Sequence, residues 1–215
     1  RLICDTNLLN AFHVLGLSRL CAGPPATRLL GDLGANVIKV ERPGAGDDTR
    51  GWGPPFDASG ESAYYLSVNR NKKSLAADLA LEVDRELIRN LISDADVVVD
   101  TFKSGMLAKH GFAVTAILAA HPRLIWCTIT GFGLTSDRAG YDFVVQAEQG
   151  WMAITGEPNG APMKVGVALA DVVAGTDACI AILAALVSRG TSNRGRHVTV
   201  SLAPIARAAL LTRAA

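Results

Sequence analysis

The fold class is decided by the stretch Ala22-Gly-Pro-Pro-Ala-Thr-Arg-Leu-Leu-Gly-Asp-Leu-Gly34, which runs directly into Ala35-Asn-Val-Ile-Lys-Val-Glu-Arg42. The first part carries apolar residues at helical spacing, at Ala26, Leu29, Leu30 and Leu33. Its two prolines suit the first turn of a helix, and Gly34 suits the C-terminal cap. The apolar run at 36–41 then predicts a strand. A helix that leads straight into a strand is typical of α/β proteins.

The same alternation continues along the chain. Further helices are predicted around 83–92, 114–122 and 171–188, and further strands at 96–100, 124–130 and 197–202, after an expected first strand before residue 20. The helix at 171–188 is apolar nearly all round, so we expect it to be deeply buried. We therefore predict an α/β fold with an open, mostly parallel, doubly wound (Rossmann-like) sheet flanked by helices.

Two segments interrupt this rhythm. Residues 42–60 and 131–141 are rich in glycine and polar residues, lack periodicity, and each follows a predicted strand. Long loops in compact α/β domains are often functional, and ligands of open parallel sheets bind beyond the carboxyl ends of the strands. We expect the functional site at these loops.

Composition bounds the class of protein. The chain has 215 residues, 49% of them hydrophobic, which is enough for one large domain or two small ones with a sizeable core. The formal net charge is +1 and no basic block stands out, which argues against a nucleic-acid partner. The four cysteines, Cys4, Cys21, Cys127 and Cys179, lie far apart and predict no metal site and no disulfide framework. This pattern fits a reducing compartment, and we expect a cytoplasmic protein.

Membrane association is not expected either. The longest apolar run, 179–187, is shorter than the roughly 20 residues of a membrane-spanning helix. The first twenty residues do not read as a secretory signal, because Asp5, Asn7 and Asn10 interrupt their apolar part. The chain begins without Met, so we expect it to be part of a longer protein.

Two common enzyme classes fit poorly. A dinucleotide site needs three glycines in the turn before the first helix, whereas the turn at 21–25 has one glycine and two prolines, which lack N–H donors. A serine hydrolase needs a Gly-x-Ser-x-Gly elbow, and the sequence has none. The four histidines, His13, His110, His121 and His197, are scattered and favour structural or surface roles.

Asp171 is the most distinctive acid. It lies in Val165-Gly-Val-Ala-Leu-Ala-Asp171-Val-Val-Ala-Gly175, a stretch of small and apolar residues. One interpretation is a helix N-cap, a position that Asp favours. The other is a carboxylate nucleophile, kept ionised by the N–H groups and dipole of the helix start. The two interpretations are compatible.

Basic residues gather near the predicted loops. Most of them are expected to be ordinary surface charge, although a phosphate-bearing ligand would need some of them. They are Arg42, Arg50, Lys72, Lys73, Lys103, Lys109 and Arg138.

Ordered blocks over most of the chain resemble the family III CoA-transferases, the group of formyl-CoA and carnitine-CoA transferases. The opening block is 22–42, already quoted. It is followed by Gly46-Asp-Asp-Thr-Arg50, Asn69-Arg-Asn-Lys-Lys-Ser74, Ala95-Asp-Val-Val-Val-Asp-Thr-Phe-Lys-Ser-Gly105, Gly131-Phe-Gly133, Ala139-Gly-Tyr-Asp-Phe143, Thr155-Gly-Glu-Pro158 and Gly166-Val-Ala-Leu-Ala-Asp171. The first twenty residues do not share the likeness.

The resemblance implies site residues. The family's catalytic aspartate corresponds to Asp171. Its CoA contacts correspond to Cys21, Ala22, Arg42, Asp78, Thr101, Phe102, Lys109, Arg138 and Tyr141. Two positions depart from the family pattern. Thr101 stands where Asn is common and lacks an amide donor, and Lys109 replaces a frequent Arg, which keeps the charge and loses the bidentate geometry.

The reaction that the resemblance implies moves CoA from an acyl-CoA to a carboxylic acid, through an anhydride and then a thioester on Asp171, with no metal. We expect backbone N–H groups at the helix start to stabilise the developing oxyanions. One alternative is a 2-methylacyl-CoA racemase, a relative of the transferases that pairs the aspartate with a histidine. Tyr141 stands at that position and argues against it. The other alternative is an inactive CoA-binding fragment.

Members of the family are longer and form interlocked homodimers. Residues 1–215 are therefore expected to be the N-terminal part of the large CoA-transferase domain, without the small second domain and the C-terminal return. The expected partners are acyl-CoA, a carboxylic acid and a second copy of the full-length protein.

Overall fold

One six-stranded sheet organises the molecule. The computed structural model describes residues 7–18 and 22–210. The sheet has the order β3-β2-β1-β4-β5-β6 and every neighbouring pair is parallel. The strands are β1 (His13–Leu17), β2 (Asn36–Glu41), β3 (Lys72–Ala76), β4 (Val97–Asp100), β5 (Ile125–Thr130) and β6 (His197–Ser201). The predicted open parallel sheet is confirmed.

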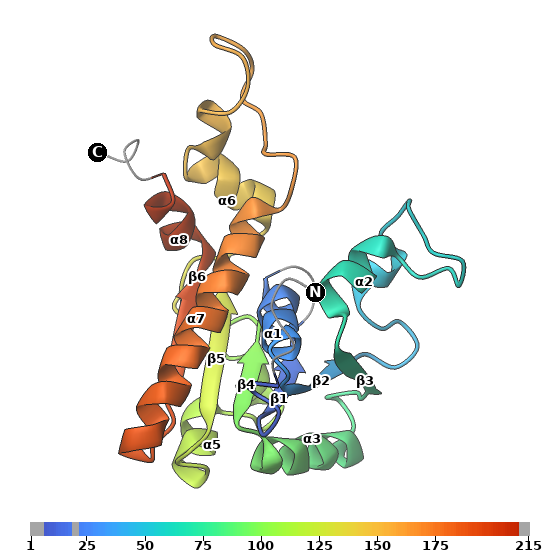
Figure 1. Ribbon diagram of the computed structural model, residues 1–215, viewed down its shortest axis with the longest axis vertical. Helices are drawn as coiled ribbons and strands as arrows, with labels where there is room; N and C mark the ends of the chain where they lie inside the picture. The colour runs from blue at the N-terminus through green and yellow to red at the C-terminus, as the bar shows by residue number, and fades with distance from the viewer. Residues whose placement is uncertain (1–6, 19–21, 211–215) are drawn as a thin grey trace.

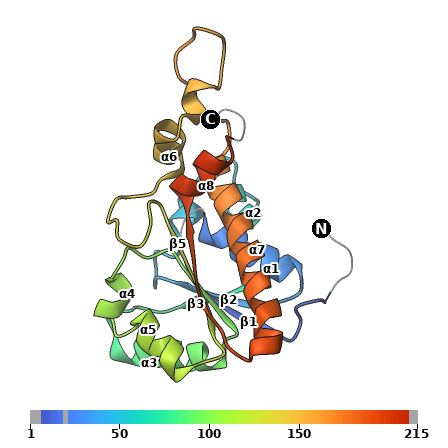
Figure 2. The ribbon, with the colours of Figure 1, turned by 90° about the vertical axis from the view of Figure 1, so that its left-hand side faces the viewer.

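Helices cover both faces of this sheet. In Figure 2, α1 (Gly23–Asp32) and α7 (Leu169–Ser192) lie on one side, and α3 (Glu82–Asp94), α4 (Met106–Lys109) and α5 (Val114–Ala120) lie on the other. The remaining helices are α2 (Ala63–Asn69), α6 (Asp142–Glu148), α8 (Leu202–Ala208) and the short 3-10 helices η1 (Asp48–Gly51) and η2 (Trp151–Ala153). In Figure 1, α6 and the loop that follows it project beyond the sheet.

The core has two layers because strand side chains alternate between the faces. Val97 and Val99 belong to the cluster under α1 and α7, whereas Val98 belongs to the cluster under α3. All three are completely buried. A strand that is buried on both faces has a continuous apolar sequence, which is why 96–100 was recognisable as a strand.

The chain changes direction between β1 and β4. It first builds outward through β2 to β3, then crosses back over α3 to place β4 on the other side of β1. The loops after β1 and β4 therefore leave the sheet in opposite directions, and the crevice between them is the place where open α/β sheets bind ligands.

The predicted elements mostly coincide with the observed ones. The strand at 36–41 has the predicted bounds, α1 carries prolines at its first positions, and Gly34 adopts a φ of 103° just after the helix. The elements that were not predicted are β3, α2, α6, α8 and the short helices α4, η1 and η2. β3 is an edge strand that is largely exposed, so Lys72, Lys73 and Ser74 stand where a buried strand would show apolar residues.

The prediction that 171–188 is deeply buried is wrong for one face of the helix. Val172, Ile180 and Val187 are exposed, Val187 at 77%, while the opposite face packs on α1, β5 and β6. By length and composition alone, α7 is apolar enough to cross a membrane, although core helices of soluble proteins meet the same criteria. A helix can therefore be apolar all round without being enclosed all round.

Close packing of α7 on α1 yields a stability prediction. A Cβ on Gly175 would lie 2.8 Å from Pro25 Cβ and 3.0 Å from the Ala22 carbonyl oxygen, whereas a Cβ on Gly190 of the same helix would meet nothing within 4 Å. Gly175→Ala should lower the free energy of unfolding by about 1–3 kcal/mol, because the two helices must separate. Gly190→Ala, the matched control, should raise it by up to about 1 kcal/mol.

Urea unfolding of the two variants and the parent checks this. Equal changes in the free energy of unfolding at positions 175 and 190 would show that the close packing of α7 on α1 does not require a glycine at position 175.

Candidate active site

The predicted CoA contacts gather at one edge of the sheet. Ala22 follows β1, Arg42 follows β2 and Asp78 follows β3. Thr101, Phe102 and Lys109 follow β4, and Arg138 and Tyr141 follow β5. Cys21 lies outside the described residues. Since the carboxyl ends of parallel strands share one edge, these residues all lie on segments that follow strands at the edge where such sheets bind ligands.

The loops after β1 and β4 touch at the point where the chain changes direction. A Cβ on Gly23 would lie 2.4 Å from Ser18 Cβ and 2.8 Å from Thr101 Cγ2. Only glycine allows this approach, because any side chain would push the two loops apart. Ala22 and Thr101, which are far apart in the sequence, are thereby brought together.

Asp100 holds the loop after β4. Its carboxylate accepts hydrogen bonds from Trp126 Nε1 at 2.7 Å, from Thr128 Oγ1 at 2.7 Å and from the backbone N–H of Phe102 at 3.0 Å. Burial raises the pKa of Asp100, and these donors oppose the rise. Asp100 was not among the predicted site residues, although an acid at the end of a buried strand is a signal of such a role.

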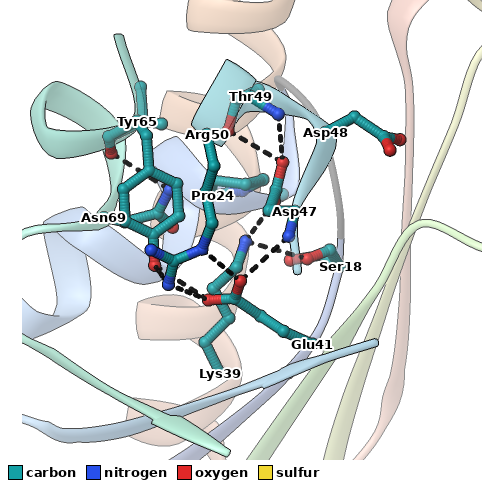
Figure 3. Close-up of polar contacts among 12 residues, drawn as sticks. Ser18, Pro24, Lys39, Glu41, Asp47, Asp48, Thr49, Arg50, Tyr65 and Asn69 are labelled. Atoms are coloured by element: carbon teal, nitrogen blue, oxygen red, sulfur yellow. Dashed lines mark hydrogen bonds and ion pairs between the residues drawn. The ribbon is translucent and has the colours of Figure 1, made fainter. Parts of the chain in front are cut away.

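The loop at 42–60 is tied to the sheet by an ionic network (Figure 3). Glu41 accepts hydrogen bonds from Arg50 Nε at 2.8 Å, Arg50 Nη2 at 3.0 Å and Tyr65 Oη at 2.8 Å. Arg50 also bonds to Glu61 and lies over the Tyr65 ring, 3.9 Å from its centroid. Arg50 is therefore a structural residue here, used within the fold rather than turned to a ligand.

Two lysines, one buried and one partly buried, hold the ends of the turn between β1 and α1. Lys39, 2% exposed, donates to the carbonyl oxygen of Ser18 at 3.3 Å and pairs with the carboxylate of Asp47. Lys72 donates to the Pro24 carbonyl oxygen at 2.9 Å. Burial and the neighbouring Lys39 charge lower the pKa of Lys72 to about 6. Figure 3 shows Ser18, Lys39 and Asp47 in contact beneath η1.

The three cations among the predicted CoA contacts differ in their surroundings. Arg42 pairs with Asp48 at 2.5 Å, and both side chains are about half exposed. Arg138 pairs with Glu148 and lies over the Phe132 ring. Lys109 is exposed, and no carboxylate within the described part of the chain pairs with it. Lys109 can accept a phosphate without giving up an existing partner.

Asp171 lies in the first turn of α7, 6% exposed. The N-cap interpretation is wrong: the helix starts at Leu169, its N-cap residue is Ala168, and Asp171 is its third residue. Residues four apart share a helix face. Asp171 therefore lies on the same face as Gly175, which touches Ala22 and Pro25. The face of α7 that carries Asp171 therefore packs against the start of α1.

The expectation that first-turn N–H groups of α7 stabilise an oxyanion is also wrong, because these donors are already in use. The N–H of Leu169 bonds to the Val167 carbonyl oxygen at 2.8 Å, and that of Val172 to the Ala168 carbonyl oxygen at 3.0 Å. The N–H groups of Ala170 and Asp171 bond to Asp142 Oδ1 at 2.8 and 3.2 Å.

Three of the histidines lie away from Asp171. His13 and His197 begin β1 and β6, at the opposite edge of the sheet, and His121 ends α5. Tyr141 lies at the start of α6, half exposed and stacked on Phe143 with ring centroids 6.0 Å apart. Within residues 7–18 and 22–210, no cluster of three or more His, Cys, Asp or Glu side chains is suited to a metal ion.

A family model settles the affiliation. Residues 9–214 match the model of "CoA-transferase family III". The chain belongs to the family III CoA-transferases. The resemblance seen in the sequence blocks is confirmed, and the match extends back to residue 9, across the early segment that lacked a visible likeness.

Relatives of this family III chain agree in sequence and fold. It is 47% identical to succinate–glutarate CoA-transferase of Agrobacterium fabrum over 210 residues. The aligned region covers 94% of this chain and 52% of that protein. It is 47% identical over 197 residues to human succinyl-CoA:glutarate CoA-transferase, covering 90% and 45%. A CaiB/BaiF family protein from Brucella suis superposes with a TM-score of 0.93 at 45% identity, over 98% of this chain and 57% of that one. The chain spans about half the length of these relatives and corresponds to their N-terminal half.

The Glu41 network predicts a dependence of stability on acid. Burial by itself raises the pKa of Glu41, but the Arg50, Tyr65 and Asp47 donors outweigh it and lower the pKa from 4.5 to about 2. A lowered pKa adds stability above the unfolded value, and that stability is lost as the pH falls from 4.5 toward 2. Glu41→Gln should cost about 1–3 kcal/mol near neutral pH, less than a fully buried pair because Arg50 is partly exposed.

The cost should shrink as the pH falls through that window. Urea unfolding of both proteins at neutral pH and at about pH 3 measures it. A difference in unfolding free energy that does not change with pH would contradict the role given to the Glu41 charge.

Proposed function

We propose that this chain carries the nucleophile and the CoA-binding loops of an acyl-CoA:carboxylate CoA-transferase. The observation that carries the proposal is the position of Asp171, buried at the start of α7 on the face that touches Ala22 and Pro25. A helix that leads to a parallel strand starts at the carboxyl edge of the sheet. The carboxylate thus shares its edge with the five loops that bear the predicted CoA contacts.

In the proposed reaction, the Asp171 carboxylate takes part in four successive acyl-transfer steps. Asp171 attacks the thioester carbonyl of the donor, the C–S bond breaks, and a mixed anhydride and CoA thiolate form. The thiolate attacks the Asp171 carbonyl carbon and releases the donor acid, which leaves an aspartyl-CoA thioester. The acceptor carboxylate then attacks the carbonyl carbon of the aspartyl-CoA thioester, which gives a new mixed anhydride and CoA thiolate. The thiolate attacks the acceptor's carbonyl carbon in this anhydride, which gives the new acyl-CoA and frees the Asp171 carboxylate. Covalent catalysis divides one difficult transfer into easier steps.

Every step exchanges a carboxylate for a thiolate, or the reverse, so no proton has to be moved. Such chemistry needs no general base beside the nucleophile, in agreement with His13 and His197 lying at the far edge of the sheet. A racemase needs a second acid–base group across the α-carbon. Tyr141 is a poor match for it near neutral pH.

For the substrates, we propose succinyl-CoA as the donor and a short dicarboxylic acid as the acceptor. The support is the 47% identity to two transferases whose names specify succinate or succinyl-CoA, and glutarate. Because the chain spans about half of those relatives, we propose that the active enzyme is the full-length protein, with a second domain and a homodimeric assembly, acting in the cytoplasm. An anhydride must be shielded from water, and we propose that those further parts of the protein provide the shielding.

The nucleophile is tested by trapping. Incubation of the full-length protein with succinyl-CoA, followed by hydroxylamine, should mark Asp171 and no other carboxylate, because only the anhydride and thioester forms react. Asp171→Asn should fold, with at most about 1 kcal/mol lost from the charge–dipole interaction, and should not transfer CoA. The readout is peptide mapping by mass spectrometry.

Transfer that persists in Asp171→Asn, or modification at another site, would contradict the proposal. Exchange of the substrate α-proton with deuterated solvent, without CoA transfer, would favour the racemase instead.

The CoA-binding loops are tested by charge removal. Lys109→Ala and Arg42→Ala should each weaken CoA binding by roughly ten- to a hundred-fold, because a charge-assisted hydrogen bond contributes about 1.5–3 kcal/mol. Calorimetric titration of CoA measures this. Lys164→Ala removes an exposed lysine from the segment between η2 and α7, outside the predicted CoA contacts, and serves as the control. Unchanged affinity in both loop variants would remove these residues from the site.

A further inference from the structure

We propose that Asp142 is a positioning residue for Asp171: a carboxylate on α6 that caps the first turn of α7 and fixes the backbone of the nucleophile. The inference rests on the proposed role of Asp171. It concerns a residue that the sequence analysis left without a function, although Asp142 lies in the Ala139-Gly-Tyr-Asp-Phe143 block.

The start of α7 depends on a cap from another helix. Its own N-cap residue is Ala168, which has no side chain able to accept a hydrogen bond. Asp142 Oδ1 takes this place and accepts the N–H groups of Ala170 at 2.8 Å and of Asp171 at 3.2 Å. The nucleophile's own backbone is thus hydrogen-bonded to Asp142.

The second carboxylate oxygen of Asp142 is also committed. Oδ2 accepts a hydrogen bond from Gln146 Nε2 at 2.5 Å. Gln146 is completely buried, and its Oε1 accepts the N–H of Val165 at 2.8 Å. That N–H needs an acceptor, so the amide nitrogen of Gln146 must face Asp142. Position 142 therefore requires two acceptor oxygens, which a carboxylate offers and an amide does not.

Asp142 also links the nucleophile to the loop after β5. It begins α6 directly after Tyr141, at the end of the loop 131–141. The two ends of that loop cross closely: a Cβ on Gly140 would lie 2.2 Å from Gly131 Cα. A chain held this tightly at Gly140 leaves Asp142 little freedom, so the cap sits at a fixed place relative to the sheet. The loop that bears Arg138 and the helix that bears Asp171 are joined through one side chain.

Four variants of the full-length protein test the role: Asp142→Ala, Asp142→Asn, Gln146→Glu and the double variant Asp142→Asn/Gln146→Glu. In Asp142→Asn, the new amide nitrogen would face the amide nitrogen of Gln146, and no hydrogen bond forms between two donors. The double variant restores the pairing between the two positions, since the carboxylate introduced at position 146 can accept from both the amide introduced at position 142 and the N–H of Val165. It also keeps the total charge of the pair. It loses the 3.3 Å hydrogen bond from Gln146 Nε2 to the Val167 carbonyl oxygen, so the recovery should be partial.

The measurement is the rate at which succinyl-CoA acylates Asp171, counted per folded molecule by hydroxylamine trapping, together with KM for succinyl-CoA. Asp142→Ala and Asp142→Asn should slow acylation by about ten- to a hundred-fold, the loss expected when a reacting group is misplaced by about 1 Å. KM should stay within about twofold, and the double variant should recover at least about half of the loss on a logarithmic scale. Asp94→Ala and Asp94→Asn, at the end of α3, are the matched controls and should leave the rate unchanged.

The outcomes separate this inference from the proposed function. An unmodified Asp171 in the parent protein would refute the function itself. A modified Asp171 in the parent, with an unchanged rate in Asp142→Ala, would refute only the positioning role. A double variant no faster than Asp142→Asn, or a KM that rises as much as the rate falls, would also overturn it. If Asp142→Ala does not fold, the comparison of Asp142→Asn with the double variant decides.

Discussion

The first turn of α1 lies so close to its neighbours that no side chain fits between them, and the geometry of the site depends on this constraint. Gly23 lets the turn touch Ser18 and Thr101, and Gly175 lets α7 touch Pro25 and the carbonyl of Ala22. One turn of helix thus sets the distance between the loop after β4 and the helix that bears Asp171. The positions of these groups follow from close approaches at two glycines rather than from long, flexible side chains, which favours a preformed site.

Around that turn, the fold uses charges that it has removed from water. Lys39 is almost fully buried, and its ammonium is satisfied by the Ser18 carbonyl and by Asp47. A buried charge is tolerated only when it is paired and hydrogen-bonded. Meeting that requirement holds the turn at Ser18, while Lys72 holds its other end at Pro24. The cost of burying the Lys39 charge is therefore offset by contacts that also fix a loop of the proposed site.

Sequence alone was enough for the parallel sheet class and five of its six strands, for α1 and for the family, because these depend on local patterns: apolar runs, two prolines and a capping glycine. It was not enough for β3, whose edge position removes the apolar signal, nor for the outer face of α7. The roles of Lys39 and Asp142 depend on partners that lie elsewhere in the sequence. A lysine inside the apolar strand 36–41 was nevertheless a signal, since such a residue needs a buried acceptor.

The capping of α7 by Asp142 bears on how Asp171 can react. A carboxylate that accepts several backbone N–H bonds is a stable anion and a weak nucleophile. Asp142 takes the N–H groups of Ala170 and Asp171, so these two donors do not stabilise the Asp171 carboxylate. A second negative charge close by further opposes the field of the helix start. Asp142 thereby takes up two of the donors that a helix start offers an anion, and this arrangement suits the attack on a thioester that we propose for Asp171.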